Sequence, residues 1–115
     1  MNNIKSDEYY IMKILENIDN IQKIMENKTK EDLEEELITN NTIVFQFINM
    51  GENISNISNE YKESKPNVPW QMIKGMRNII VHNYENVSYD TLYETITKDL
   101  PYLKEELSKW NMTLL

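Results

Sequence analysis

The length and composition of the chain restrict it to a few protein classes. Its 115 residues suffice for one domain, taken as 1–115, and are too few for two ordinary hydrophobic cores. It has no cysteine, which excludes disulfides, thiolate metal sites and cysteine nucleophiles, and its two glycines and three prolines disfavour turn-rich β folds and glycine-rich phosphate loops. Because the sequence has no signal-peptide pattern and no apolar run long enough for a membrane span, we expect a cytoplasmic protein.

Charge is distributed unevenly along the chain. The formal net charge is −7, and the acidic excess lies in residues 1–60, whereas residues 61–115 are neutral overall. Segment 61–84 is locally basic, with four cations against a single carboxylate: Lys62, Lys65, Lys74 and Arg77 against Glu63. Since an acidic surface repels nucleic acid, this segment is the part of the chain that is compatible with an anionic ligand.

Apolar residues at three–four spacing predict helices along the first half of the chain. The first helix covers about 5–27, with Ser6 and two acidic residues at its start, where free N–H groups favour them. The second begins at Thr29 or Lys30 and continues to about residue 61. Because such a helix would be about 45 Å long, we expect it to bend near Asn40–Asn41.

A proline-rich segment at 64–69 is the predicted linker between the two halves. A short helix over 70–82 follows it. Ser88 is a predicted N-cap for a last helix, which Pro101 should kink or restart. No stretch shows the alternation typical of strands, so the sequence predicts an all-α, antiparallel bundle of four or five helices.

Arg77 and His82 are the residues best suited to chemistry, because they are the only arginine and the only histidine in the chain. A guanidinium binds phosphate through its planar fork and an imidazole exchanges protons near pH 7. Together they suit cleavage of RNA by its own 2′-hydroxyl, a reaction that needs no metal. The plainer interpretation is that His82 caps a helix and Arg77 pairs with a carboxylate of the second helix. On one regular helix the two side chains lie about 140° apart, so they meet only if the helix ends between them or a partner chain contributes.

The segment around these two residues resembles the signature of HepT-like toxins, small helical RNases of the HEPN superfamily. It reads Gly75-Met76-Arg77-Asn78-Ile79-Ile80-Val81-His82-Asn83-Tyr84 and follows Pro69-Trp70. The Arg-x4-His-x-Tyr spacing is the form found in HepT proteins paired with a MntA-type nucleotidyltransferase. The resemblance spans nearly the whole chain, since Met50-Gly51-Glu52 is similar to the family's Gly-Glu segment and residues 90–103 are similar to its last helix. Asn83 departs from the pattern, because many relatives have aspartate there.

The resemblance implies a toxin of a toxin–antitoxin pair and a role for each motif residue. Arg77 would bind the scissile phosphate of an RNA substrate, and His82 would act as general base or acid in a transesterification that leaves a cyclic phosphate. Tyr84 would be the residue that the nucleotidyltransferase antitoxin modifies with AMP, which silences the toxin by adding charge and bulk. The resemblance also implies a homodimer in which the motifs of two chains approach across the interface.

Several other residues have both a functional and a structural interpretation. Asn78 and Glu52 are candidates for orienting Arg77, and Gly51 for close helix packing. Trp70 is favoured as a core anchor over a base-stacking platform, and the lysines of segment 61–84 either guide RNA or are simply solvated. No residues have metal-ligand spacing, so neither a metal nor a cofactor is expected.

Two alternatives to a ribonuclease remain open from the sequence. The first is a non-catalytic module that binds a nucleotide or docks on a nucleotidyltransferase, which the acidic net charge favours. The second is a helical dimerisation unit without a ligand.

Overall fold

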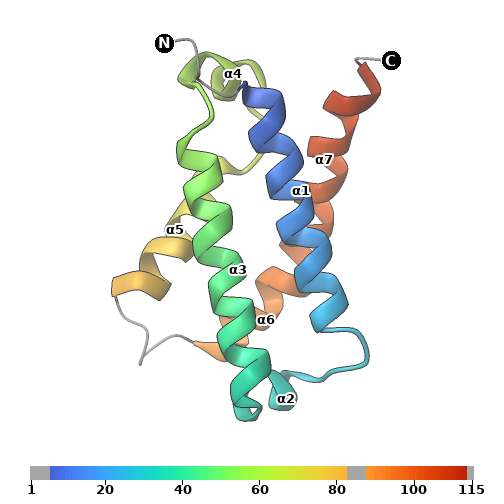
Figure 1. The fold of residues 1–115 in the computed structure, drawn as a ribbon, viewed down its shortest axis with the longest axis vertical. Coiled ribbons are helices and arrows are strands. Elements are labelled where there is room, and N and C mark those ends of the chain that lie inside the picture. Colours follow the sequence, from blue (N-terminus) through green and yellow to red (C-terminus); the bar gives the residue numbers. More distant parts are fainter. Residues whose placement is uncertain (1–5, 83–87, 114–115) are drawn as a thin grey trace.

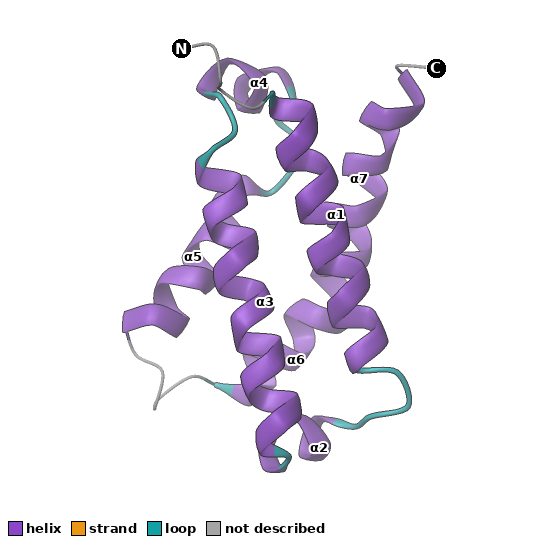
Figure 2. Cartoon of the chain, viewed as in Figure 1, coloured by secondary structure: helices purple, strands orange, loops and turns teal. Residues whose placement is uncertain are grey.

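All regular structure in the described part of the chain is helical, as predicted. The computed structural model describes residues 6–82 and 88–113, and no strand occurs in them (Figure 1, Figure 2). The elements in chain order are α1 Asp7–Ile24, α2 Lys30–Glu35, α3 Leu37–Ser55, α4 Asn59–Ser64, α5 Trp70–His82, α6 Tyr89–Glu94, the π-helical segment η2 Thr95–Asp99 and α7 Leu100–Thr113. Within these ranges, every helix is too short or too polar to cross a membrane.

Helices α1 and α3 form the centre of the fold. They run antiparallel side by side, and α5 packs on α3 while α7 packs on α1 (Figure 1). The core between them is made of fully buried side chains, which include Ile11, Ile14, Ile18 and Ile21 of α1 and Ile43, Phe47 and Met50 of α3. The three–four spacing of these residues places them on one face of each helix, and their burial drives the two helices together.

A network of side-chain amides fixes how α1 and α3 align. The Asn17 Nδ2 donates to Gln46 Oε1 at 2.9 Å and to Asn49 Oδ1 at 3.1 Å, and the Asn53 Nδ2 donates to Asn17 Oδ1 at 3.0 Å. Asn17 is only 5% exposed. Because a buried amide without partners is costly, the helices cannot slide by one turn without losing these bonds.

The predicted second helix is wrong in one respect: the chain forms α2, α3 and α4 instead of one long, bent helix. The first break falls at Glu36, whose backbone is extended with φ −87° and ψ 107°. Its carboxylate accepts from Lys28 Nζ at 2.7 Å and from Thr39 Oγ1 at 2.8 Å, and these contacts hold the turn. The expected bend at Asn40 does not occur, because the buried Asn40 amide stays inside α3 and donates to the Leu33 carbonyl oxygen and the Tyr89 hydroxyl.

The second break, between α3 and α4, depends on a contact with the start of the chain's first helix. Asp7 of α1 accepts from the backbone N–H of Ser58 and from its hydroxyl, both at 2.8 Å. Ser58 in turn caps α4 by accepting from the Tyr61 N–H. The turn is therefore set by a residue about fifty positions away, which the local sequence does not show.

The predictions for the second half of the chain are confirmed except at Pro101. The linker lies between α4 and α5, α5 covers Trp70–His82, and Ser88 caps α6 by accepting from the Thr91 N–H. Pro101 is the second residue of α7 and directly follows the π-helical segment η2, and the helical backbone continues from α6 through η2 into α7. The last helix therefore does not stop and restart at the proline, and its irregularity is the π-helical segment just before it.

Candidate functional site

Arg77 of α5 crosses α3 at Gly51, and this crossing brings the two helices into close contact. A Cβ atom built on Gly51 would lie 2.5 Å from Arg77 Cγ, 2.6 Å from its Cβ and 3.2 Å from its Cδ. Real carbon atoms do not approach so closely, so no side chain larger than that of glycine fits here without displacing the arginine. The close packing expected of Gly51 is therefore packing against the aliphatic stem of Arg77.

The guanidinium of Arg77 is oriented by the two residues proposed for that task. Its Nη1 donates to the Asn78 Oδ1 at 3.0 Å, and its Nη2 lies 3.7 Å from the Glu52 Oε1. Glu52 remains 58% exposed, so the ion pair is weak and leaves much of the positive charge uncompensated. The structure thus also contains the ion pair of the plainer interpretation, in which Arg77 pairs with a carboxylate of the predicted second helix.

The Nε of Arg77 is buried and has no hydrogen-bond partner among the described residues. A buried donor without an acceptor costs about 1–3 kcal/mol. Arginine occupies this position, although a shorter apolar side chain would avoid that cost. Such an energetic cost at a charged residue is typical of a site selected for binding or chemistry.

His82 is the last residue of α5, and the backbone between Arg77 and His82 is continuous helix. The helix therefore does not end between the two residues, which are five positions apart on it. The other way in which the two side chains could meet, the contribution of a partner chain, stays a prediction. Tyr84, the expected AMP acceptor, lies outside the described residues.

The structure places the remaining candidates close to this site or in the core. Trp70 is 8% exposed, which confirms it as a core anchor, and its indole Nε1 donates to the Lys65 carbonyl oxygen at 3.2 Å. Among the described residues, no group of three or more His, Cys, Asp or Glu side chains could hold a metal ion. Arg77, Asn78, Glu52 and Gly51 thus form one cluster at the α3–α5 crossing, hereafter the arginine site.

Comparison with known proteins identifies the family. A family model described as "Ribonuclease HepT-like" matches residues 14–110. The chain belongs to the HepT-like family. The "Probable ribonuclease HepT" of Thermococcus cleftensis is 30% identical over 83% of this chain and 90% of that protein. A "Putative RNase" of Caldanaerobacter subterraneus is 27% identical over 92% of this chain and 95% of its own length.

One relative is much longer than this HepT-like chain. The "Gamma-glutamylcyclotransferase and putative RNase" of Methanocaldococcus jannaschii is 30% identical over 91% of this chain, which spans 47% of that protein. No solved structure matches the chain significantly. The resemblance seen in the sequence is therefore confirmed at the level of the family, whereas the nucleotidyltransferase partner stays a prediction.

The two glycines of the chain provide a test of the Arg77–Gly51 contact. We expect Gly51→Ala to destabilise the protein by about 1–3 kcal/mol, because the added methyl collides with the arginine stem. Gly75→Ala is the matched control: a Cβ there meets nothing within 4 Å, so the better helix propensity of alanine should stabilise α5 by about 0.5–1 kcal/mol. Urea unfolding measures both. Equal stabilities for the two variants would contradict the contact.

Proposed function

We propose that this HepT-like chain is an endoribonuclease toxin that cleaves RNA without a metal ion and that a partner nucleotidyltransferase controls. The observation that carries the proposal is the arginine site. It presents the chain's only guanidinium, oriented by Asn78 and only weakly paired with Glu52, in a family described as HepT-like ribonucleases. A fixed fork of donors with uncompensated charge suits a phosphodiester.

The proposed reaction is an internal transesterification. The ribose 2′-oxygen attacks the neighbouring phosphorus, the bond from phosphorus to the 5′-oxygen breaks, and a 2′,3′-cyclic phosphate remains. His82 would act as the general base that accepts the 2′-hydroxyl proton, or as the general acid that protonates the leaving 5′-oxygen. Arg77 would stabilise the negative charge that builds up on the phosphoryl oxygens. Because the nucleophile belongs to the substrate, the reaction requires neither a metal nor a cofactor.

The active unit is proposed to be a homodimer with a composite site. The divergence of Arg77 and His82 on a continuous α5 supports it, because an arginine of one chain can then act beside a histidine of the other. An exposed face of α3 supplies a contact surface. Ile38 is 82% exposed and Phe45 is 60% exposed, and with Glu52 they follow one another at intervals of seven residues, so all three share one line along the helix.

The part of this face from Ile38 to Phe45 suits a second copy of the chain because it carries no charge. Residues 37–51 contain no charged side chain, in a protein whose net charge is −7. Two acidic copies can meet there without bringing like charges together, and a two-fold axis makes the same patch meet itself. The line ends at Glu52, so the arginine site would lie at the edge of this contact.

The residues of the proposed reaction can be tested by substitution. We expect Arg77→Ala and His82→Ala each to reduce RNA cleavage by about 100-fold or more, with Arg77→Lys retaining only part of the activity because it lacks the planar fork. Cleavage by the purified chain in excess EDTA, with detection of cyclic phosphate ends, provides the assay. Circular dichroism checks that the variants fold. Wild-type rates in a folded Arg77→Ala or His82→Ala variant would overturn the mechanism.

The proposed interface makes a separate prediction. Phe45→Glu should convert the dimer into monomers, since two buried charges would face each other across the two-fold axis, and it should abolish cleavage with the monomer still folded. Met12→Glu is the control, because Met12 is an exposed apolar residue of α1 outside this face, 47% accessible. Light scattering after gel filtration measures the mass. A dimeric Phe45→Glu variant would contradict this use of α3.

Control by a nucleotidyltransferase is proposed to act on Tyr84. An AMP group on a phenol two residues beyond His82 would add negative charge and bulk near the phosphate-binding arginine and so compete with RNA. Intact mass and peptide mapping after co-expression with a nucleotidyltransferase of the MntA type should show one or more AMP units on the Tyr84 peptide. A Tyr84→Phe variant should remain unmodified and stay active. No added mass on the wild-type chain would remove this part of the proposal.

The net charge of −7 favours a second candidate function, a non-catalytic module that binds a nucleotide or docks on a nucleotidyltransferase. In this candidate function the arginine site is a binding site, and His82 takes no part in proton transfer. Nucleotide binding by a chain that never cleaves RNA, even when Tyr84 is unmodified, would support this candidate over the first.

A further inference from the structure

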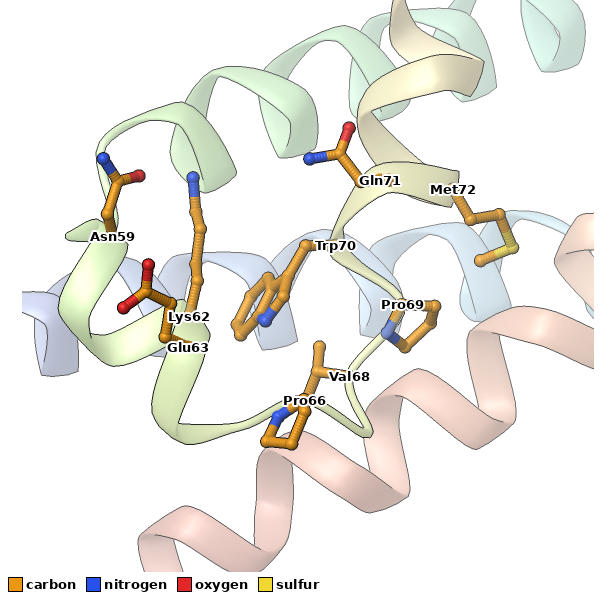
Figure 3. A pocket seen from close by; sticks show the side chains of 9 residues that line it. All are labelled: Asn59, Lys62, Glu63, Pro66, Val68, Pro69, Trp70, Gln71 and Met72. Atoms are coloured by element: carbon orange, nitrogen blue, oxygen red, sulfur yellow. The ribbon is translucent and has the colours of Figure 1, made fainter.

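A cavity of about 520 Å³ lies where α4, the linker and the start of α5 meet (Figure 3). Its size is in the range of pockets that hold small ligands. Pro66, Val68, Pro69 and Trp70 supply apolar walls, and Lys62 of α4 and Gln71 of α5 supply polar groups at the edge. The cavity is separate from the arginine site, and the proposed reaction does not use it.

Two side chains in the walls of this cavity, Trp70 and Val68, are held by the surrounding structure. The Trp70 indole is tied by its hydrogen bond to the Lys65 carbonyl oxygen and packs edge-on against Tyr61, with ring centroids 6.2 Å apart. Val68 is 5% exposed. A fixed aromatic and proline surface offers contact area to a flat or cyclic group with little loss of conformational entropy.

Positive charge near the cavity comes from Lys62, which lines it, and from Lys74, one turn beyond Trp70 on α5. Lys62 and Lys74 have no carboxylate within ion-pair distance among the described residues. Desolvation and repulsion from Lys74 lower the pKa of Lys62, opposed in part by Asp7, so the two ammonium groups are close enough to disfavour one another. Glu63 also lines the cavity and partly offsets them. An anion between the two lysines would relieve their repulsion.

The cavity and the arginine site lie along the same helix. Trp70, Lys74 and Arg77 are positions i, i+4 and i+7 of α5, which places them along one side of the helix, and the rise from Trp70 to Arg77 is about 10 Å. A single RNA strand with one phosphate at Arg77 can therefore reach the cavity with a nucleotide next to the cut.

We propose that this cavity is a nucleotide subsite for single-stranded RNA: Pro66 and the small part of Trp70 that lines the cavity contact the base or ribose of a nucleotide flanking the scissile bond, and Lys62 binds its phosphate together with Lys74 from outside the lining. The inference rests on the proposed ribonuclease function and extends it to substrate binding. It also explains how a chain with a net charge of −7 holds RNA, because the strand follows the locally basic segment 61–84.

The test uses the full chain and a 2′-O-methyl RNA oligonucleotide of about a dozen nucleotides, which cannot be cleaved through its 2′-oxygen. Lys62→Gln/Lys74→Gln should weaken binding about tenfold or more, and should reduce the slope of log K against log salt by about 1.4, at about 0.7 per lost phosphate contact. The matched control, Lys13→Gln/Lys98→Gln, removes the same charge from α1 and η2 and should change the affinity less than twofold.

A second variant separates the cavity from general attraction of RNA to lysines. Gln71 is an exposed residue at the edge, so Gln71→Trp should fill the cavity without disturbing the core, and should weaken binding several-fold with the salt slope unchanged. Equal affinities for the lysine variant and its control, or wild-type affinity in Gln71→Trp, would overturn the subsite. If Arg77→Ala loses RNA binding while Lys62→Gln/Lys74→Gln and Gln71→Trp bind like the wild type, the subsite is overturned and the proposed function is not. A wild-type chain that neither binds nor cleaves RNA would overturn both proposals.

Discussion

The contact between the stem of Arg77 and the bare backbone of Gly51 is the constraint on which the site depends. It lets α5 cross α3 so closely that a single methyl group would collide with the arginine. The same contact fixes the direction in which the guanidinium leaves the helix pair, toward Asn78 and Glu52. The amide network of Asn17 holds α3 in register on α1, so the position of Gly51 is set by the centre of the fold. The charge proposed to meet a phosphate is thereby positioned by packing, and only weakly by ion pairing.

Much of the fold follows from local chemistry and was predictable. The isoleucines of α1 recur at helical spacing, and Ser6 and Ser88 cap helices as short polar side chains commonly do. The break at Glu36 was not predictable, since nothing in that stretch resembles a helix stop, and its cause is a lysine eight residues away. At Asn40 the prediction failed in the opposite direction, because a bend was expected and the helix is continuous. The polar side chain of Asn40 is satisfied by tertiary partners that the sequence pattern does not show.

The arginine site was predictable in its residue types and only partly in its geometry. Arg77 stood out because lysine supplies every other basic charge, and Glu52 and Asn78 were candidates that the structure brings to it. The partnership of Gly51 with Arg77 was missed, although the rarity of glycine in this chain was a usable signal. The exposed Phe45 and the cavity beside Trp70 were also beyond the sequence, because both depend on which face of a helix remains uncovered after packing.

The central claim is that Arg77 of one chain acts with His82 of the other. It is tested most directly by mixing the inactive Arg77→Ala and His82→Ala proteins under conditions that exchange subunits. In a mixed dimer with sites shared between chains, one site regains both residues, so cleavage should recover to about a quarter of the wild-type rate at equal amounts. If each chain carries its own complete site, every site in the mixture lacks one residue. A mixture of exchanged dimers that stays inactive would contradict the account.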